Sequence, residues 1–405
     1  MLLEFTIGNY LSFRDKKTLS LEATSITDYP ENVISIGEYK ILRSIVMYGA
    51  NSSGKSNFLK ALTKMVDIVR TSAGQSSTAE IDVIPFLLNA ETEDQPSHFE
   101  ILLLIDGVRY RYGFEICRKK VHYEWLYEKK SYYSTERNLF LREKNTIELG
   151  KNFSEGIGIE NKTRENALFL AICDQFNGEI SKEIMSWFGR LNQLSGIEHT
   201  SKRSLTVFCM KEKGVIEENV RKFITPLNLG FENFSLSESG DEIITFHKKH
   251  NKDNSFEIKE FNSEERESSG TNKIFDLAGY ISGSLWIGWM TIIDEMDAKL
   301  HPLLTKEIVR MYNDPEINKN NAQLIFASHD TNLLSNANLR RDQIYFIEKN
   351  QYEESDLYSL VEYKDSNGNK TRKDRNYEKD YIEGRYGAIP FIGNFSKLIG
   401  NEGKL

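Results

Sequence analysis

A phosphate-binding pattern near the start of the chain limits the fold more than any other feature. Residues 49–56 read GANSSGKS and fit the pattern G-x-x-x-x-G-K-[ST]. The apolar run 45–48 before this loop predicts a buried parallel strand, and apolar residues at helical spacing over 57–69 predict a helix after it. Backbone N–H groups of such a loop, and the positive end of such a helix, converge on phosphate oxygens. The segment therefore predicts an α/β domain that holds a phosphorylated ligand.

The loop residues have separate expected roles. Lys55 is expected to reach the β and γ phosphates of a nucleotide, and the Ser56 hydroxyl is expected to ligate Mg²⁺. The other expected nucleotide-binding positions in this segment are Gly49, Asn51, Ser52, Ser53, Gly54 and Asn57.

A second apolar strand ends in two acids, in the sequence TIIDE of residues 291–295. Asp294 is expected to hold Mg²⁺ through a water or through Ser56, and Glu295 to activate the attacking water as a general base. The alternative is a solvated acidic strand end, or a helix cap made by Asp297. Because no Asn-Lys-x-Asp tetrad that would read guanine is present, the adjacent acids favour ATP as the nucleotide.

Another buried strand is expected at residues 323–327, and His329 follows it closely. At the end of a strand beside the acids, His329 is expected to sense the γ-phosphate. The alternative is a buried histidine hydrogen-bonded to backbone.

Several of these segments, in this order, resemble the SMC, RecF and OLD-like members of the ABC ATPases. Residues 294–297 (DEMD) and 300–302 (LHP) are similar to their Walker B motif and D-loop, and residues 327–330 (ASHD) to their switch histidine. Residues 267–271 (ESSGT) are similar to the signature motif, which is more often LSGGQ, and residues 9–14 (NYLSFR) to the first-hairpin motif beside the nucleotide.

The resemblance implies that Ser268, Ser269 and Gly270 bind the γ-phosphate of ATP held by a second subunit. Two chains would then enclose two nucleotides in a head-to-tail homodimer, with Lys55, Glu295 and His329 as the catalytic residues. A Ser/Gly loop that only caps a helix is the competing explanation. No glutamine is assigned to the Q-loop of the family.

The expected fold class is α/β. The resemblance implies an ABC-ATPase-type head, with a mostly parallel sheet flanked by helices, an antiparallel β subdomain and an inserted helical/β lobe. Strands are also expected at 2–7, 17–21, 99–105, 108–116, 122–128, 138–142 and 343–348, and helical segments at 165–195, 216–224 and 302–312. The expected division is 1–115 for the first part of the head, 116–230 for the lobe, 231–350 for the second part of the head and 351–405 for a tail.

Composition narrows the setting. The formal net charge of −8 argues against a surface devoted entirely to nucleic acid, although it leaves room for a local basic groove. The three cysteines are odd in number, far apart and not in a metal-ligand spacing, so we expect neither a disulfide framework nor a cysteine metal site. With no apolar run near the roughly 20 residues that cross a bilayer, the expected location is the cytoplasm of a microbe.

The tail narrows the resemblance further. Residues 381–390 (YIEGRYGAIP) look like the end of stand-alone ATPases of bacterial abortive-infection loci, of the RloA and AbiL type. This implies an anti-phage switch that acts with a separately encoded effector, such as a Toprim or RloB-like nuclease, and responds to DNA or a phage-derived trigger.

Two other functions stay open at this point. One is a RecF-type repair ATPase that acts directly on DNA, and the other is a nuclease with its cutting site in the lobe. The basic runs 247–252 and 370–375 could meet nucleic-acid phosphates, but each is more often a solvated turn.

The sequence generates a first prediction. Lys55→Ala removes the ammonium group expected to contact the β and γ phosphates, so ATP binding should be abolished while the fold is retained. Titration with a fluorescent ATP analogue, with circular dichroism as the check on folding, measures this effect. Wild-type affinity in Lys55→Ala would show that the loop does not bind the nucleotide.

Overall fold

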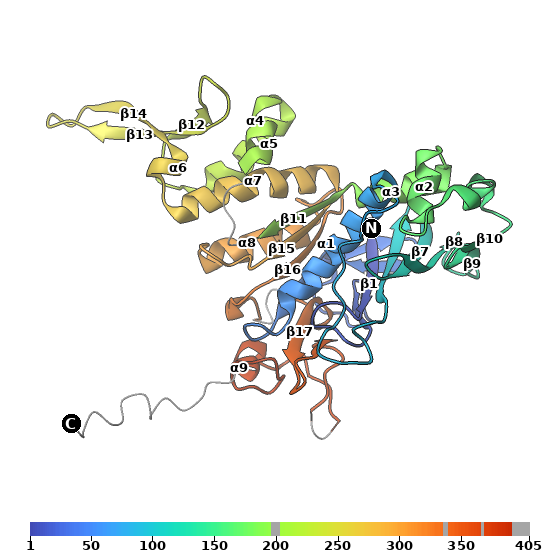
Figure 1. The fold of residues 1–405 in the computed structure, drawn as a ribbon. Helices are drawn as coiled ribbons and strands as arrows, with labels where there is room; N and C mark the ends of the chain where they lie inside the picture. Colours follow the sequence, from blue (N-terminus) through green and yellow to red (C-terminus); the bar gives the residue numbers. More distant parts are fainter. Residues whose placement is uncertain (196–202, 335–338, 366–367, 391–405) are drawn as a thin grey trace, which may run out of the picture.

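The computed structural model describes residues 1–195, 203–334, 339–365 and 368–390. Two large sheets form the body, and helix α1 (Lys55–Thr71) lies between them (Figure 1). Phe58 of this helix contacts Phe5 of the antiparallel sheet edge-on, with ring centroids 5.5 Å apart. The same core contains Phe58 and Ile292 of the parallel sheet. The expected α/β class, with a parallel sheet, flanking helices and an antiparallel subdomain, is confirmed.

The first sheet has the order β11-β15-β16-β5-β17-β18. Its first five strands are parallel, and β18 runs antiparallel at the edge. The strand bounds are β11 (Leu191–Ser195), β15 (Met290–Asp294), β16 (Gln323–Ala327), β5 (Ser44–Tyr48), β17 (Ile344–Lys349) and β18 (Ser355–Ser359).

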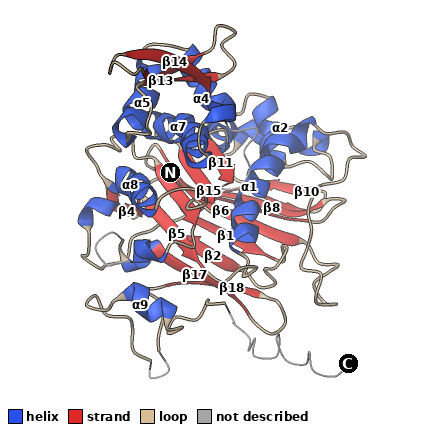
Figure 2. Cartoon of the chain, turned by 90° about the vertical axis from the view of Figure 1, so that its left-hand side faces the viewer, coloured by secondary structure: helices blue, strands red, loops and turns tan. Residues whose placement is uncertain are grey.

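Both faces of this parallel sheet are buried, which explains the continuous apolar runs of its strands. In β5, Ile45 and Met47 face the core beneath α1, whereas Val46 and Tyr48 face a second core. That second core is covered by α7 (Ser269–Ile287) and α8 (Pro302–Asn313), so helices lie on both faces (Figure 2).

The second sheet is antiparallel and has the order β10-β9-β8-β7-β6-β1-β2. Asp106 and Gly107, both with positive φ, make the tight turn between β6 and β7 that the Asp-Gly pair predicts. The bounds are β10 (Thr146–Leu149), β9 (Arg137–Glu143), β8 (Val121–Lys129), β7 (Val108–Ile116), β6 (Ser97–Ile105), β1 (Leu2–Gly8) and β2 (Lys17–Ser20).

Smaller elements complete the chain. A three-stranded sheet and a two-stranded sheet contain β12 (Asn233–Leu236), β13 (Ile243–His250), β14 (Phe256–Asn262), β3 (Val33–Ile36) and β4 (Tyr39–Leu42). The remaining helices are α2 (Phe169–Gln175), α3 (Glu179–Phe188), α4 (Arg203–Lys211), α5 (Val215–Ile224), α6 (Ser263–Arg266) and α9 (Tyr377–Ile382). No helix in the described ranges combines the length and the apolar character that crossing a membrane requires.

Two local expectations were wrong. Helical periodicity was expected to continue to residue 195, but Leu191–Ser195 forms β11 and pairs in parallel with β15. The solvated turn expected at 247–252 begins as strand instead, because β13 continues to His250 and pairs with β14. In both places, pairing with a distant strand overrides the local pattern.

The sheets also cross the expected lobe, residues 116–230. Strands β8, β9 and β10 extend the antiparallel sheet that begins with β1, and β11 joins the parallel sheet. The last part of the expected tail, residues 391–405, lies outside the described residues.

A buried carboxylate joins the antiparallel sheet to the helices of the lobe. Glu124 of β8 accepts hydrogen bonds from the backbone N–H groups of Phe169 (2.7 Å) and Leu170 (3.0 Å) at the start of α2, and from the Tyr112 hydroxyl (3.0 Å). The Arg142 guanidinium lies 3.5 Å from the same carboxylate. Burial raises the pKa of Glu124, while Arg142 and these donors favour the ionised form.

Glu124→Gln should therefore destabilise the protein strongly. The amide nitrogen would face donors where a carboxylate oxygen now accepts, and Arg142 would lose its ion partner. Breaking a buried pair of this kind costs about 3 kcal/mol, which urea denaturation would measure. The exposed Glu148→Gln is the matched control and should change stability by under about 0.5 kcal/mol. Equal effects of the two substitutions would contradict this account.

Candidate nucleotide site

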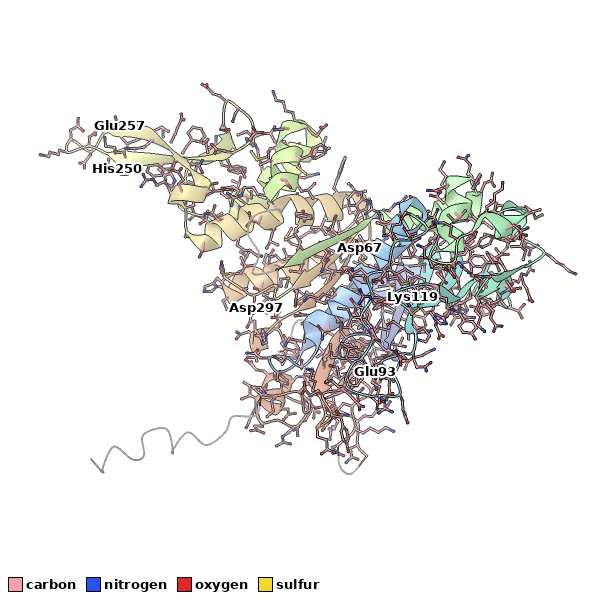
Figure 3. All side chains as sticks on the ribbon, in the orientation of Figure 1. Asp67, Glu93, Lys119, His250, Glu257 and Asp297 are labelled. Atoms are coloured by element: carbon pink, nitrogen blue, oxygen red, sulfur yellow. The ribbon has the colours of Figure 1, made fainter. Side chains whose placement is uncertain are left out.

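The expected site residues meet because three parallel strands end at one edge of the sheet. Gly49 follows β5, Asp294 ends β15, and His329 comes two residues after β16. The Met296 amide donates to the Ala327 carbonyl at 3.0 Å, which ties the two strand ends together. Figure 3 shows Asp297 on this side of the molecule. We call this side the nucleotide edge.

Two glycines of the phosphate loop are required by their surroundings. A Cβ at Gly49 would lie 2.3 Å from the Ile347 carbonyl oxygen. At Gly54, φ is +117°, and a Cβ would lie 2.3 Å from the Ser355 hydroxyl. The loop thus packs so closely on β17 and β18 that side chains are excluded at both positions. Asn51 and Ser52 are exposed at its tip.

Lys55 is held at the mouth of this loop. Its side chain is buried, and its ammonium donates to the carbonyls of Gly49 (2.7 Å) and Ala50 (3.0 Å). Burial lowers the pKa of Lys55, and the carboxylates of residues 294–297 oppose that shift. A bound triphosphate would supply further negative charge and stabilise the ammonium form.

Buried polar atoms without a hydrogen-bond partner among the described residues include the Ser53 hydroxyl and one carboxylate oxygen of Asp294. An unsatisfied buried acceptor or donor costs about 1–3 kcal/mol. A phosphate beside Ser53 and a hydrated Mg²⁺ beside Asp294 would satisfy both atoms. Ser56, in the first turn of α1, offers the second hard oxygen ligand.

The donor set suits magnesium rather than a metal caged by the protein. Among the described residues, no group of three or more His, Cys, Asp and Glu side chains is placed to hold a metal ion. Mg²⁺ commonly keeps several waters and binds one or two protein oxygens together with substrate phosphates. The pair Ser56 and Asp294 fits that pattern.

The segment after β15 turns sharply. Glu295 has φ +50°, a left-handed conformation that is uncommon for a residue with a side chain and often marks a functional site. Asp297 accepts from the backbone N–H of His329 at 3.0 Å. The alternative in which Asp297 caps a helix is wrong, because the His301 side chain caps α8 by accepting from Leu303 N–H.

His329 is exposed rather than buried, so the alternative of a buried strand-end histidine is also wrong. Its backbone is fixed by Asp297, while its ring faces solvent at the nucleotide edge. A ring in this place is free to meet a ligand that enters from solvent.

The signature-like segment also lies at this edge, at the start of α7. Ser268 caps the helix, since its hydroxyl accepts from Thr271 N–H at 3.1 Å, and Ser269 is exposed at the first helical position. A Cβ at Gly270 would lie 3.1 Å from the Lys299 carbonyl oxygen, which places the helix start against the turn that follows β15. Capping therefore accounts for Ser268 and leaves Ser269 exposed at the helix start.

A supporting layer of serines lies behind the phosphate loop. The Ser355 hydroxyl donates to the Ser53 carbonyl at 2.7 Å and lies 2.8 Å from the Ser12 hydroxyl, which accepts from Asn57 at 2.9 Å. Ser12 belongs to the segment 9–14 that was expected to lie beside the nucleotide. Ser355 was missed, because a lone serine among polar residues carries no sequence signal.

Ser355→Ala should weaken ATP binding about tenfold without unfolding the protein. It removes one buried hydrogen bond and leaves the Ser12 hydroxyl with one partner fewer, a loss of about 1–2 kcal/mol. Ser359→Ala, in the same strand, is the matched control because its hydroxyl bonds to Glu362 instead of the loop. ATP-analogue titration of both variants measures the difference. Equal affinities would show that the serine layer does not hold the loop.

The chain is similar to a known protein family and to solved structures. Residues 44–335 match the family described as "AAA domain, putative AbiEii toxin, Type IV TA system". Among solved structures, the SMC head domain from Thermotoga maritima has 11% identity and a TM-score of 0.41, covering 88% of this chain and 98% of that one. An SMC head bound to the C-terminal winged-helix domain of ScpA has 14% identity, a TM-score of 0.40, and coverage of 88% and 97%. The comparison with curated proteins gave no match. Because the matched range spans well over half of its length, the chain belongs to this AAA-domain family.

Proposed function

We propose that the protein binds Mg-ATP at the nucleotide edge and hydrolyses it as a head-to-tail dimeric switch. The observation that carries this proposal is that the phosphate loop holds Lys55, while Asp294, with its unsatisfied oxygen, and Glu295 act electrostatically on the Lys55 ammonium. Glu295 follows β15 directly and has a positive φ, so the strand conformation ends before it.

The residues divide the chemistry among themselves. Lys55 leaves the loop carbonyls and neutralises oxygens of the β and γ phosphates. Bound by Ser56 and Asp294, Mg²⁺ would supply positive charge to the same oxygens. The Glu295 carboxylate takes the proton of the attacking water, and His329 meets the γ-phosphate. Neutralising charge and positioning the water are the main contributions a protein makes to phosphoryl transfer.

We include a second subunit in the site because the phosphate loop and the signature-like helix start lie apart within one chain. The phosphate loop follows β5 and packs on β17 and β18, whereas the signature-like helix start packs after β15. Strand β16 lies between β15 and β5, so the axes of β15 and β5 are about 10 Å apart. An exposed Ser269 at a helix start can serve as an anion site for the nucleotide of another copy.

Helix α9 in the tail contacts segments next to the proposed nucleotide site, so a change at the site can move the tail. The Tyr381 ring of α9 packs on Tyr48 at the end of β5, with centroids 5.6 Å apart. Thr331, two residues after His329, donates to Glu378 of the same helix at 2.8 Å. Helix α9 thus contacts both the strand before the phosphate loop and the segment after the switch histidine.

We place the switch in anti-phage defence on the resemblance of residues 381–390 to RloA- and AbiL-type ATPases. In this proposal, the lobe 116–230 and the tail 351–405 transmit ATP binding and hydrolysis to a separately encoded cytoplasmic effector. A Toprim or RloB-like nuclease is the effector that the resemblance favours.

Glu295→Gln should slow hydrolysis about 100-fold or more, because a general base contributes roughly 10²–10⁴-fold to rate. Nucleotide binding should survive, so ATP should hold the variant as a dimer that light scattering detects. Glu316→Gln, an exposed carboxylate after α8, is the matched control and should hydrolyse ATP normally. Turnover by Glu295→Gln at the wild-type rate would rule out the assignment of the base.

A further inference from the structure

The hairpin β13–β14, residues 243–262, projects away from the body of the molecule; we call it the arm. Its tip, marked by His250 and Glu257 in Figure 3, extends beyond the start of α7. Strand β14 pairs only with β13 among the described strands, and its first five residues are exposed. A projecting strand with an open edge is costly to leave uncovered, because it invites pairing with other chains.

One face of the arm carries exposed apolar side chains. The register pairs Ile258 with Lys248 and Phe256 with His250, which places these four residues on the same face. Phe256 is 52% exposed and Ile258 is 51% exposed. The Lys248 ammonium lies 5.1 Å from the Phe256 ring centroid and the His250 ring centroid lies 6.3 Å from it, so the ring stays half exposed beside these neighbours. Phe256 and Ile258 thus form a small apolar patch on a projecting strand, available for contact with another surface.

The opposite face anchors the arm to the signature-like segment. Thr245 donates to the Glu267 carboxylate at 2.6 Å, and His247 lies 2.7 Å from the same oxygen. Glu267 immediately precedes Ser268, the cap of α7. A movement of the arm would therefore be transmitted through Glu267 to the start of α7, which is proposed to meet the γ-phosphate bound by the partner.

Symmetry decides what the arm meets. The arm lies at one end of the nucleotide edge, beyond α7, and α9 lies at the other end, beyond the phosphate loop, in both views (Figures 1 and 2). A head-to-tail pair brings the signature end of one chain to the phosphate-loop end of its mate. The arm of each chain then lies beside the α9 segment of the other.

That segment offers a matching apolar surface. Ile382, the last residue of α9, is 62% exposed, and Ile389 is 40% exposed. The Ile389 side chain lies against the turn that follows α9, since a Cβ at Gly384, two residues after Ile382, would lie 2.7 Å from it.

We infer that the arm is a clasp for a second copy of this chain, with Phe256 and Ile258 seated on Ile382 and Ile389 of that copy. The inference rests on the proposed ATP-dependent dimer and adds a contact outside the nucleotide site. The clasp couples dimer closure to the signature-like segment through Glu267.

Cysteine cross-linking tests the contact directly. Ile258→Cys and Ile382→Cys are introduced together into the Glu295→Gln protein, with Cys117, Cys173 and Cys209 replaced by serine or alanine. With ATP and copper-phenanthroline as oxidant, an intermolecular disulfide should form between the two thiols. Lys55→Ala in the same background should prevent it, and each single cysteine should give no specific dimer. Absence of the cross-link in a protein that light scattering shows to be dimeric would overturn the inference.

A second experiment uses no cysteine. Phe256→Glu combined with Ile258→Glu should raise the protein concentration needed for ATP-dependent dimerisation at least tenfold, with ATP-analogue binding by the monomer unchanged. Ile157→Glu, at a residue that is 72% exposed in the lobe, is the matched control and should have no effect. If the arm variant dimerises normally, the clasp is wrong and the switch stands. If Glu295→Gln itself never dimerises, the proposed switch fails and the clasp falls with it.

Discussion

The carboxyl ends of β5, β15 and β16 meet at one edge of a parallel sheet, and every chemical proposal made for this protein depends on that meeting. Residues some 240 positions apart, Lys55 and Asp294, act on each other electrostatically only because parallel pairing of these strands places their ends together. Placing these polar groups together costs stability, because Lys55 is buried and one Asp294 oxygen has no hydrogen-bond partner in the described part of the chain. Strained backbone at Glu295 adds to that cost, as is common where a site is preorganised.

The sequence could predict the strands, the helices and the loop between β5 and α1 wherever local pattern and chemistry agree. The loop at 49–56 has few conformations open to it, because Gly49 and Gly54 pack where no side chain fits. Buried parallel strands have short, continuous apolar sequences. This pattern predicted strands at 45–48 and 323–327, which the structure contains as β5 and β16. The signature-like segment 267–271 was singled out by its resemblance to a family motif, and α7 begins within it at Ser269.

What the sequence could not predict depends on contacts between distant segments. Leu191–Ser195 has residues compatible with the preceding helix, and only its pairing with β15 makes it a strand. Ser355 supports the phosphate loop from an edge strand that lies some 300 residues away, and nothing near it in the sequence points to that role. Residues 247–252 of the arm were expected to be a solvated turn, because their lysines and histidines show no apolar alternation and only the register with β14 makes residues 247–250 a strand.

The central claim is that each γ-phosphate is held between two chains, and mixing two inactive variants tests it most directly. Lys55→Ala lacks a working phosphate loop, and Ser269→Arg lacks a working signature-like helix start. In a mixed head-to-tail dimer, one of the two sites receives its loop from the Ser269→Arg chain and its helix start from the Lys55→Ala chain, and both parts are intact. Mixing should therefore restore ATPase activity that neither variant has alone. No recovery at any mixing ratio, with both variants folded and the Ser269→Arg chain still binding ATP, would contradict a site shared between subunits.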